Sequence, residues 1–252
     1  MPILDCSTRA STLRSLSAGF GCSPSSLSVA LLAFDLDALY ETDLHIDIPP
    51  EEYLYHYACE RFGAPADYSS AYWFHGTRTV PGNLFSDGLL SLEQSEKRVM
   101  DMLIALAPDT EVSSRLQKWN VHGGVPEEMF RMRTLDPAHW GPYGYLIRET
   151  HEHASLLSQH EYLGLPELVE DVCRAYQQYY GRDLSTHYQQ LLQPCIVWFI
   201  SVVQHQLHAL SAALSYAYTS VRGIRPSGLS IYGIDRGGIP VSHEQIVNVE
   251  FL

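Results

Sequence analysis

Along this chain of 252 residues, some segments place hydrophobic residues at the spacing of a helix, and others have the short apolar runs of β-strands. Residues 49–63 begin with proline and glutamates, carry aromatic residues at helical spacing and end on glycine, a pattern that predicts a helix. Residues 95–108 predict a second helix, which proline stops. Residues 195–203 instead form a continuous apolar run, typical of a strand buried on both faces. Short strands and longer helices therefore share the chain.

The remaining apolar segments extend this assignment. We expect further strands at 71–76, 143–149, 229–234 and 245–252. One or two helices are predicted over 165–192 with a break at Gly181, and another over 205–223, closed by Gly223. Residues 28–40 fit either a helix or a strand.

The first 26 residues are rich in serine and threonine and show little periodicity, so we expect a loosely ordered start. The strands are few, unevenly spaced and do not alternate as βαβ units, which favours an antiparallel α+β fold. We divide the chain into a mostly helical extension, 1–66, and a domain built on the sheet, 67–252.

Composition narrows the class of protein. Hydrophobic residues make up 46% of the chain and charged residues 18%, which is enough apolar surface for a packed core. Sixteen basic residues against 29 acidic ones leave a formal charge of −13, which disfavours broad binding to nucleic acid. The five cysteines form no CxxC pair, and Cys195 lies inside an apolar run, where it is expected to be a core residue.

No apolar run reaches the roughly 18 residues that a membrane span needs, and no signal peptide is recognised. We therefore expect a soluble cytoplasmic protein without membrane partners, with non-classical secretion as an effector left open.

The stretch "AYWFHGTRTVPGNLFSDGLLSLEQ" (Ala71–Gln94) carries the most informative motif. A predicted strand ends on His-Gly-Thr-Arg, and a Gly-Leu step follows about ten residues later. This pattern resembles the first signature of ADP-ribosyltransferases of the His-Tyr-Glu type, the group of diphtheria toxin and the poly(ADP-ribose) polymerases. The resemblance covers about twenty residues and implies a split antiparallel sheet with inserted and N-terminal helices.

The resemblance implies roles for the residues of the motif. His75 would hold the adenosine ribose of NAD, Gly76 would face the nicotinamide carboxamide with its bare backbone, and Thr77 would support the turn. Arg78 is counted with them as a cofactor-binding residue. A tyrosine from another strand would stack on nicotinamide, and we prefer Tyr145 to Tyr143.

In active members of this family a late glutamate stabilises the oxocarbenium-like charge that develops as nicotinamide departs. The candidates are Glu244, Asp235 and Glu250. Glu244 precedes the last predicted strand, but its spacing departs from the usual family pattern. The resemblance therefore supports the fold more strongly than it supports catalysis of ADP-ribose transfer.

The implied function is consumption of NAD as a substrate, without a metal: ADP-ribose passes to a macromolecular acceptor, or NAD is hydrolysed. A protein acceptor suits the acidic charge better than a nucleic acid, and an effector, toxin or stress enzyme would fit. An inactive relative that binds a nucleotide or a protein is one alternative. An RNA 2′-phosphotransferase of the same fold is another, although the chain has few basic residues to grip phosphate. A structural histidine in an unrelated fold is the third.

Two histidine-rich segments are weaker candidates. Residues 151–161 match no common zinc template and are expected to form a solvated segment. His205 and His208 lie one helical turn apart, but no third metal ligand is evident.

Overall fold

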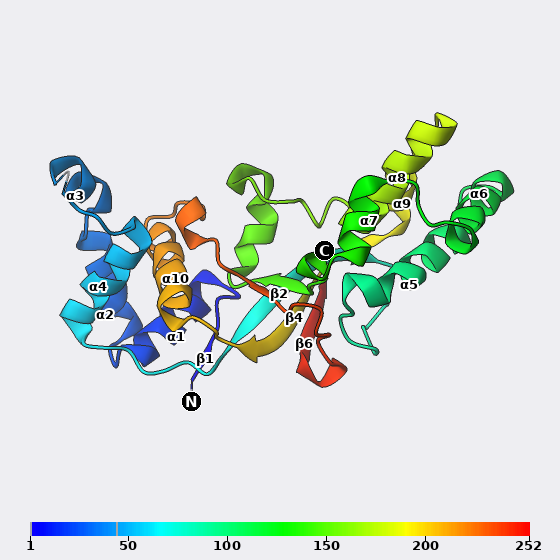
Figure 1. Ribbon diagram of the computed structural model, residues 1–252. Helices are drawn as coiled ribbons and strands as arrows, with labels where there is room; N and C mark the ends of the chain where they lie inside the picture. Colours follow the sequence, from blue (N-terminus) through cyan, green and yellow to red (C-terminus); the bar gives the residue numbers. More distant parts are fainter. Residues whose placement is uncertain (1, 44) are drawn as a thin grey trace. The chain divides into compact units, whose positions relative to one another are not determined.

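The computed structural model describes residues 2–43 and 45–252, and in this part of the chain it has ten α-helices and a six-stranded sheet (Figure 1). The α+β class predicted from the sequence is confirmed. The strands follow the order β5-β3-β2-β4-β6, with β1 paired to β2. The strands are β1 (Ile3–Leu4), β2 (Ser70–Thr79), β3 (Tyr143–Tyr145), β4 (Gln193–Val202), β5 (Gly233–Asp235) and β6 (Ile246–Phe251).

Five of the ten helices in the described ranges, α4, α5, α8, α9 and α10, lie in the segments predicted as helical. They are α1 (Arg9–Gly19), α2 (Pro24–Ala33), α3 (Leu36–Thr42), α4 (Pro50–Phe62), α5 (Leu92–Ala105), α6 (Thr110–Val121), α7 (Glu128–Leu135), α8 (Glu167–Tyr180), α9 (Ser185–Leu191) and α10 (Gln206–Val221). Short 3-10 helices are η1 (Pro137–His139), η2 (Arg148–His153), η3 (Ser155–Leu157), η4 (Gly228–Ser230) and η5 (His243–Gln245). Gly181 breaks α8 from α9 with a left-handed φ of 72°, as predicted.

The sheet is mainly antiparallel. Phe74 of β2 lies opposite Tyr145 of β3, and Cys195 of β4 lies opposite Phe251 of β6. The exception is β1, whose Ile3 pairs in parallel with Ser70. Cys195 is fully buried, which confirms its assignment to the core.

Three strands differ clearly from their predictions. Where a strand was expected at 229–234, the 3-10 helix η4 takes the first residues and β5 covers only Gly233–Asp235. β2 continues through Gly76 to Thr79, so His75 lies in the middle of a strand rather than at its end. The β-branched residues that follow the glycine sustain the extended backbone. The second predicted strand stops at Tyr145 instead of reaching Glu149, because Leu146 and Arg148 donate to carbonyl groups of Tyr232 and Cys6.

The expectation of a loosely ordered start is wrong. Residues 9–19 form α1, and Thr8 closes its first turn in a reciprocal capping box with Ser11. Ser23 caps α2 in a similar way, through its side-chain oxygen and the Ser26 amide. Serine and threonine therefore begin helices here.

The chain forms two compact units, which we describe separately. The first comprises Met1–Phe74, Tyr145–Gln159 and Ile200–Ile234. Its helix α10 packs against α1, α2 and α4 (Figure 1), and contributes fully buried small and aliphatic residues, among them Ala209, Leu210, Ala213 and Leu214. In this unit the N-terminal helices thus share a core with α10, and the division at residue 66 stays a prediction.

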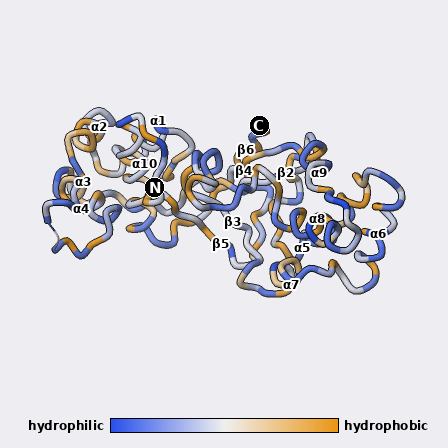
Figure 2. The backbone as a smooth tube through the Cα atoms, turned by 90° about the horizontal axis from the view of Figure 1, so that it is seen from above, coloured by the Kyte–Doolittle hydropathy of each residue, from blue (hydrophilic) through white to orange (hydrophobic). Residues whose placement is uncertain are grey.

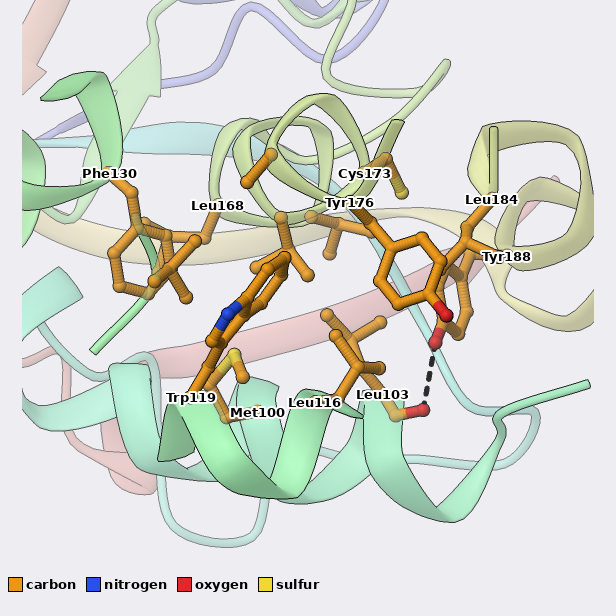
Figure 3. Close-up of a cluster of buried hydrophobic side chains, with 14 of the residues drawn as sticks. Met100, Leu103, Leu116, Trp119, Phe130, Leu168, Cys173, Tyr176, Leu184 and Tyr188 are labelled. Carbon is orange, nitrogen blue, oxygen red and sulfur yellow. Dashed lines mark hydrogen bonds between the residues drawn. The ribbon is translucent and has the colours of Figure 1, made fainter. Parts of the chain in front are cut away.

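The second unit comprises His75–Gly144, His160–Phe199 and Asp235–Leu252. Its core joins α5, α6, α7 and α8 around aromatic and aliphatic side chains (Figure 3). Helix α8 mixes hydrophobic and hydrophilic positions along its length (Figure 2), and its apolar residues face this core. Fully buried Tyr188 donates from its hydroxyl to the Leu103 carbonyl at 2.9 Å.

Helices α6 and α7 were missing from the sequence prediction. Helix α6 buries Val112, Leu116 and Trp119 at spacings of four and three residues, behind the N-cap Asp109, so a local signal for it existed.

Among the described residues, no single helix is long and hydrophobic enough to cross a membrane. The bent helix pair Arg9–Gly19 and Pro24–Thr42 meets that test by length and composition alone.

Candidate functional site

His75 is the central residue of the candidate site, and its ring is held by the backbone of β3. Its Nδ1 lies 2.7 Å from the carbonyl oxygen of Tyr143. A carbonyl only accepts hydrogen bonds, so Nδ1 carries the proton. Burial lowers the pKa of His75, an effect that the bond to Tyr143 opposes less strongly. The imidazole is therefore neutral at pH 7, with Nε2 as an acceptor.

Within the described residues, no protein group forms a hydrogen bond with Nε2 of His75. His75 as a whole residue is intermediate between buried and exposed. A neutral imidazole in this tautomer suits a hydroxyl donor on a ligand, such as a sugar hydroxyl.

Gly76 and Thr77 continue the same strand. Side chains of a strand alternate between its faces, so His75 and Thr77 share one face. Thr77 is partly exposed and Gly76 is buried.

Arg78 is a structural clamp. Its Nε donates to the Leu192 carbonyl at 2.9 Å, and its Nη2 donates to the Gln189 carbonyl at 2.6 Å. Its Nη1 donates to the carbonyls of Leu163 and Gly164, at 2.6 and 3.3 Å. The guanidinium thus ties β2 to the end of α9 and to the loop before α8, and its donors are directed at the chain's own backbone.

Tyr143 and Asp235 extend the group around His75. The Tyr143 hydroxyl donates to the Ala138 carbonyl at 3.0 Å. Burial, followed by the nearby Asp235 carboxylate, raises the pKa of Tyr143 to about 12, so the phenol stays protonated. Asp235 is exposed and also accepts from the Gly237 amide at 2.8 Å, which closes its own turn. His75 is thus bonded to the backbone of Tyr143, and the charge of Asp235 acts on the phenol of the same tyrosine.

Tyr145 belongs to the first unit and has its own partners there. Its hydroxyl donates to Oε1 of Gln159 at 2.8 Å, and its ring lies edge-on to His151, with 5.2 Å between centroids.

His151 is only 6% exposed, and its Nε2 is 2.9 Å from the Phe74 carbonyl. The prediction of a solvated segment at 151–161 is therefore wrong for this histidine. Its burial depends on strand β2, and no pattern in the polar segment around it signals that contact.

The first unit also contains a partly buried charged network that the sequence did not reveal. Arg9 binds the Glu149 carboxylate with two N–H groups, at 3.2 and 2.8 Å, and the buried Tyr216 hydroxyl donates to it at 2.6 Å. Burial alone would raise the pKa of Glu149, but these donors outweigh burial and lower it. The network connects α1, η2 and α10.

The Gly-Leu step of the motif has a packing role. Leu89 and Val241 exchange two backbone hydrogen bonds of 2.9 Å each. Gly88 has a φ of +81°, and a Cβ there would lie 2.1 Å from the Val241 carbonyl oxygen. Glycine is thus required because the segment before β6 passes directly over this step.

The two other acidic candidates, Glu244 and Glu250, lie near the C-terminus. Glu244, in η5, is exposed, and the Ser242 hydroxyl lowers its pKa. Glu250, in β6, accepts from Nε1 of Trp198 at 3.1 Å.

Within the described ranges, no three histidine, cysteine or acidic side chains lie close enough together to hold a metal ion.

Comparisons of the chain with protein-family models, with curated proteins and with solved structures found no match.

Proposed function

We propose that this protein binds NAD and cleaves its bond to nicotinamide, transferring ADP-ribose to a macromolecular acceptor or to water. The observation that carries the proposal is the state of His75: Nδ1 is fixed on the Tyr143 carbonyl, the ring is neutral, and Nε2 remains available to a ribose hydroxyl. The sequence motif around His75 adds support, and the α+β class is compatible with the fold that the resemblance implies, although His75 lies inside β2 rather than at its end.

In this proposal Tyr143, which belongs to the same unit as His75, stacks on the nicotinamide ring, and a carboxylate faces the positive charge that develops on the ribose. Asp235 is the favoured carboxylate because its charge acts on Tyr143, whose backbone carbonyl holds His75. Glu244 is the alternative. A protein acceptor remains our expectation, because the chain carries a charge of −13.

A second candidate function is nucleotide binding without transfer. The observation in its favour is that Asp235 accepts a hydrogen bond from the Gly237 amide, and that Glu244 is fully exposed with a pKa that the Ser242 hydroxyl lowers. Phosphotransfer to or from RNA is the least supported reading, since the Arg78 guanidinium is directed at backbone carbonyls.

The test is incubation of the purified protein with NAD, with NAD binding measured by calorimetry and free nicotinamide measured by chromatography. His75→Ala should weaken binding about tenfold, the order expected for one or two lost hydrogen bonds. Asp235→Asn should leave binding nearly intact and lower turnover by roughly 10²-fold. His122→Ala, at an exposed histidine in the same unit, is the matched control and should change neither quantity.

The outcomes separate the candidates. Binding without nicotinamide release, with or without a mixture of acceptor proteins, would favour the second candidate. Failure of the wild-type protein to bind NAD, or equal binding by His75→Ala, would reject the assigned role of His75.

A further inference from the structure

A groove along helix α7 lies outside the proposed NAD site. It has a volume of about 810 Å³ and lies in the second unit, between the outer face of α7 and the end of α8. Its lining includes the apolar residues Met132, Leu135 and Tyr179 and the charged residues Glu128, Arg131 and Asp136. None of these residues takes part in the contacts around His75.

The apolar residues of the lining are exposed. Leu135 is 68% exposed, Tyr179 60% and Met132 36%. Residues 128, 131, 132 and 135 follow the helical spacing of one face, while Phe130 and Thr134 of the opposite face are buried in the core. These three side chains therefore offer a small apolar contact, bordered by charged residues, to a partner that lies along α7.

The groove is also held rigidly. Arg133 of α7 forms an ion pair with the fully buried Asp171 of α8, and Glu127 accepts from the first amides of α7. The ring of Tyr179 lies edge-on to Trp119, with 6.2 Å between centroids. A preformed surface loses little conformational freedom when a partner binds.

Charge identifies the kind of partner. Glu127 is paired with Arg174, so the charges that remain in the lining are the carboxylates of Glu128 and Asp136 against the single guanidinium of Arg131. The chain as a whole adds a charge of −13. A second copy, a nucleic acid or an anionic lipid surface would meet repulsion of like charges, whereas a cationic segment would be attracted.

We propose that the α7 groove binds a cationic segment of another protein, with an aliphatic or aromatic side chain on Met132, Leu135 and Tyr179 and lysine or arginine facing Glu128 and Asp136. This inference does not depend on the NAD proposal, because the groove shares no residue with that site.

The test measures fluorescence anisotropy of labelled peptides with the whole chain. The probe is an amphipathic peptide of leucine and lysine, about two heptads long. Two control peptides keep its length: one replaces lysine by glutamate, and the other replaces leucine by serine. The leucine–lysine peptide should bind, and both controls should bind at least tenfold more weakly, since each lacks one of the two required features.

Variants locate the binding site. Leu135→Ser should weaken the probe by about tenfold through lost apolar contact. Glu128→Lys should weaken it by about threefold to tenfold, and more at low salt. Leu84→Ser is the matched control, because Leu84 is 66% exposed in the same unit but does not line the groove. All three positions are exposed, so circular dichroism should show an unchanged fold.

Three results would each overturn the proposal. The wild-type protein does not bind the leucine–lysine peptide, the lysine–serine peptide binds it equally well, or Leu135→Ser binds the probe as tightly as wild type does.

Discussion

The close approach of Gly88 to the Val241 carbonyl leads to a quantitative prediction. Gly88→Ala places a methyl group where its carbon would lie 2.1 Å from the carbonyl oxygen. Backbone atoms cannot move aside as a flexible side chain can, so the segment before β6 must shift. Gly82 provides a matched control, because its φ of +80° is nearly the same as the +81° of Gly88, while a Cβ added at Gly82 would meet nothing within 4 Å.

The magnitude follows from two contributions. Alanine in the left-handed region costs roughly 1–2 kcal/mol, partly offset by the lower entropy of its unfolded chain. This contribution is common to Gly82→Ala and Gly88→Ala. At Gly88 alone, the two hydrogen bonds between Leu89 and Val241 are also strained or lost, and each contributes about 0.5–1.5 kcal/mol. Gly88→Ala should therefore lower the free energy of unfolding by about 1–3 kcal/mol more than Gly82→Ala.

The assay is urea unfolding, combined with hydrogen exchange at the amides of Leu89 and Val241. The midpoint should fall further for Gly88→Ala than for Gly82→Ala, and both amides should lose protection in the first variant alone. Equal destabilisation by the two variants, with unchanged exchange at both amides, would refute the close packing of this step.

Three further predictions concern side chains that join distant segments. Glu149→Gln should lower the free energy of unfolding by about 1–3 kcal/mol above pH 5. Because the folded pKa of Glu149 is lowered, wild type should lose this advantage as the pH falls through that pKa. Stability is measured against pH for both proteins, and two curves that never converge in acid would contradict the prediction. Arg78→Lys should cost about 1–3 kcal/mol in urea unfolding, since one ammonium cannot reproduce the bonds of a planar guanidinium to separate carbonyls, and an unchanged midpoint would argue against the clamp. Tyr188→Phe should cost about 1 kcal/mol by removing the hydrogen bond to Leu103, with thermal unfolding as the measurement and an unchanged Tm as the contrary result.

Much of the helical structure was predictable because its signals are local. Proline and glutamate begin α4, glycine follows it, and Gly181 separates α8 from α9. The apolar run of β4 likewise marked a buried strand, and Cys195 within it is fully buried. The N-terminal error has a local cause too, because serine and threonine serve equally in loops and as helix caps.

The site was predictable as a list of residue types and not as an arrangement. The His-Gly-Thr-Arg motif pointed to His75, but it did not show that the ring is held by the Tyr143 carbonyl or that Arg78 is bound to backbone carbonyls. Glu244, Asp235 and Glu250 were all candidates in the sequence, and our preference for Asp235 depends on the effect of its charge on Tyr143.

The sequence by itself determined the α+β class and five of the ten described helices, and it singled out His75 as a candidate, since periodicity, caps and short motifs act over a few residues. Tertiary structure alone decided the tautomer of His75, the burial of His151 and the need for glycine at position 88. Each of these depends on a backbone carbonyl supplied by a remote segment, and a carbonyl group, which every residue carries, leaves no mark in the sequence.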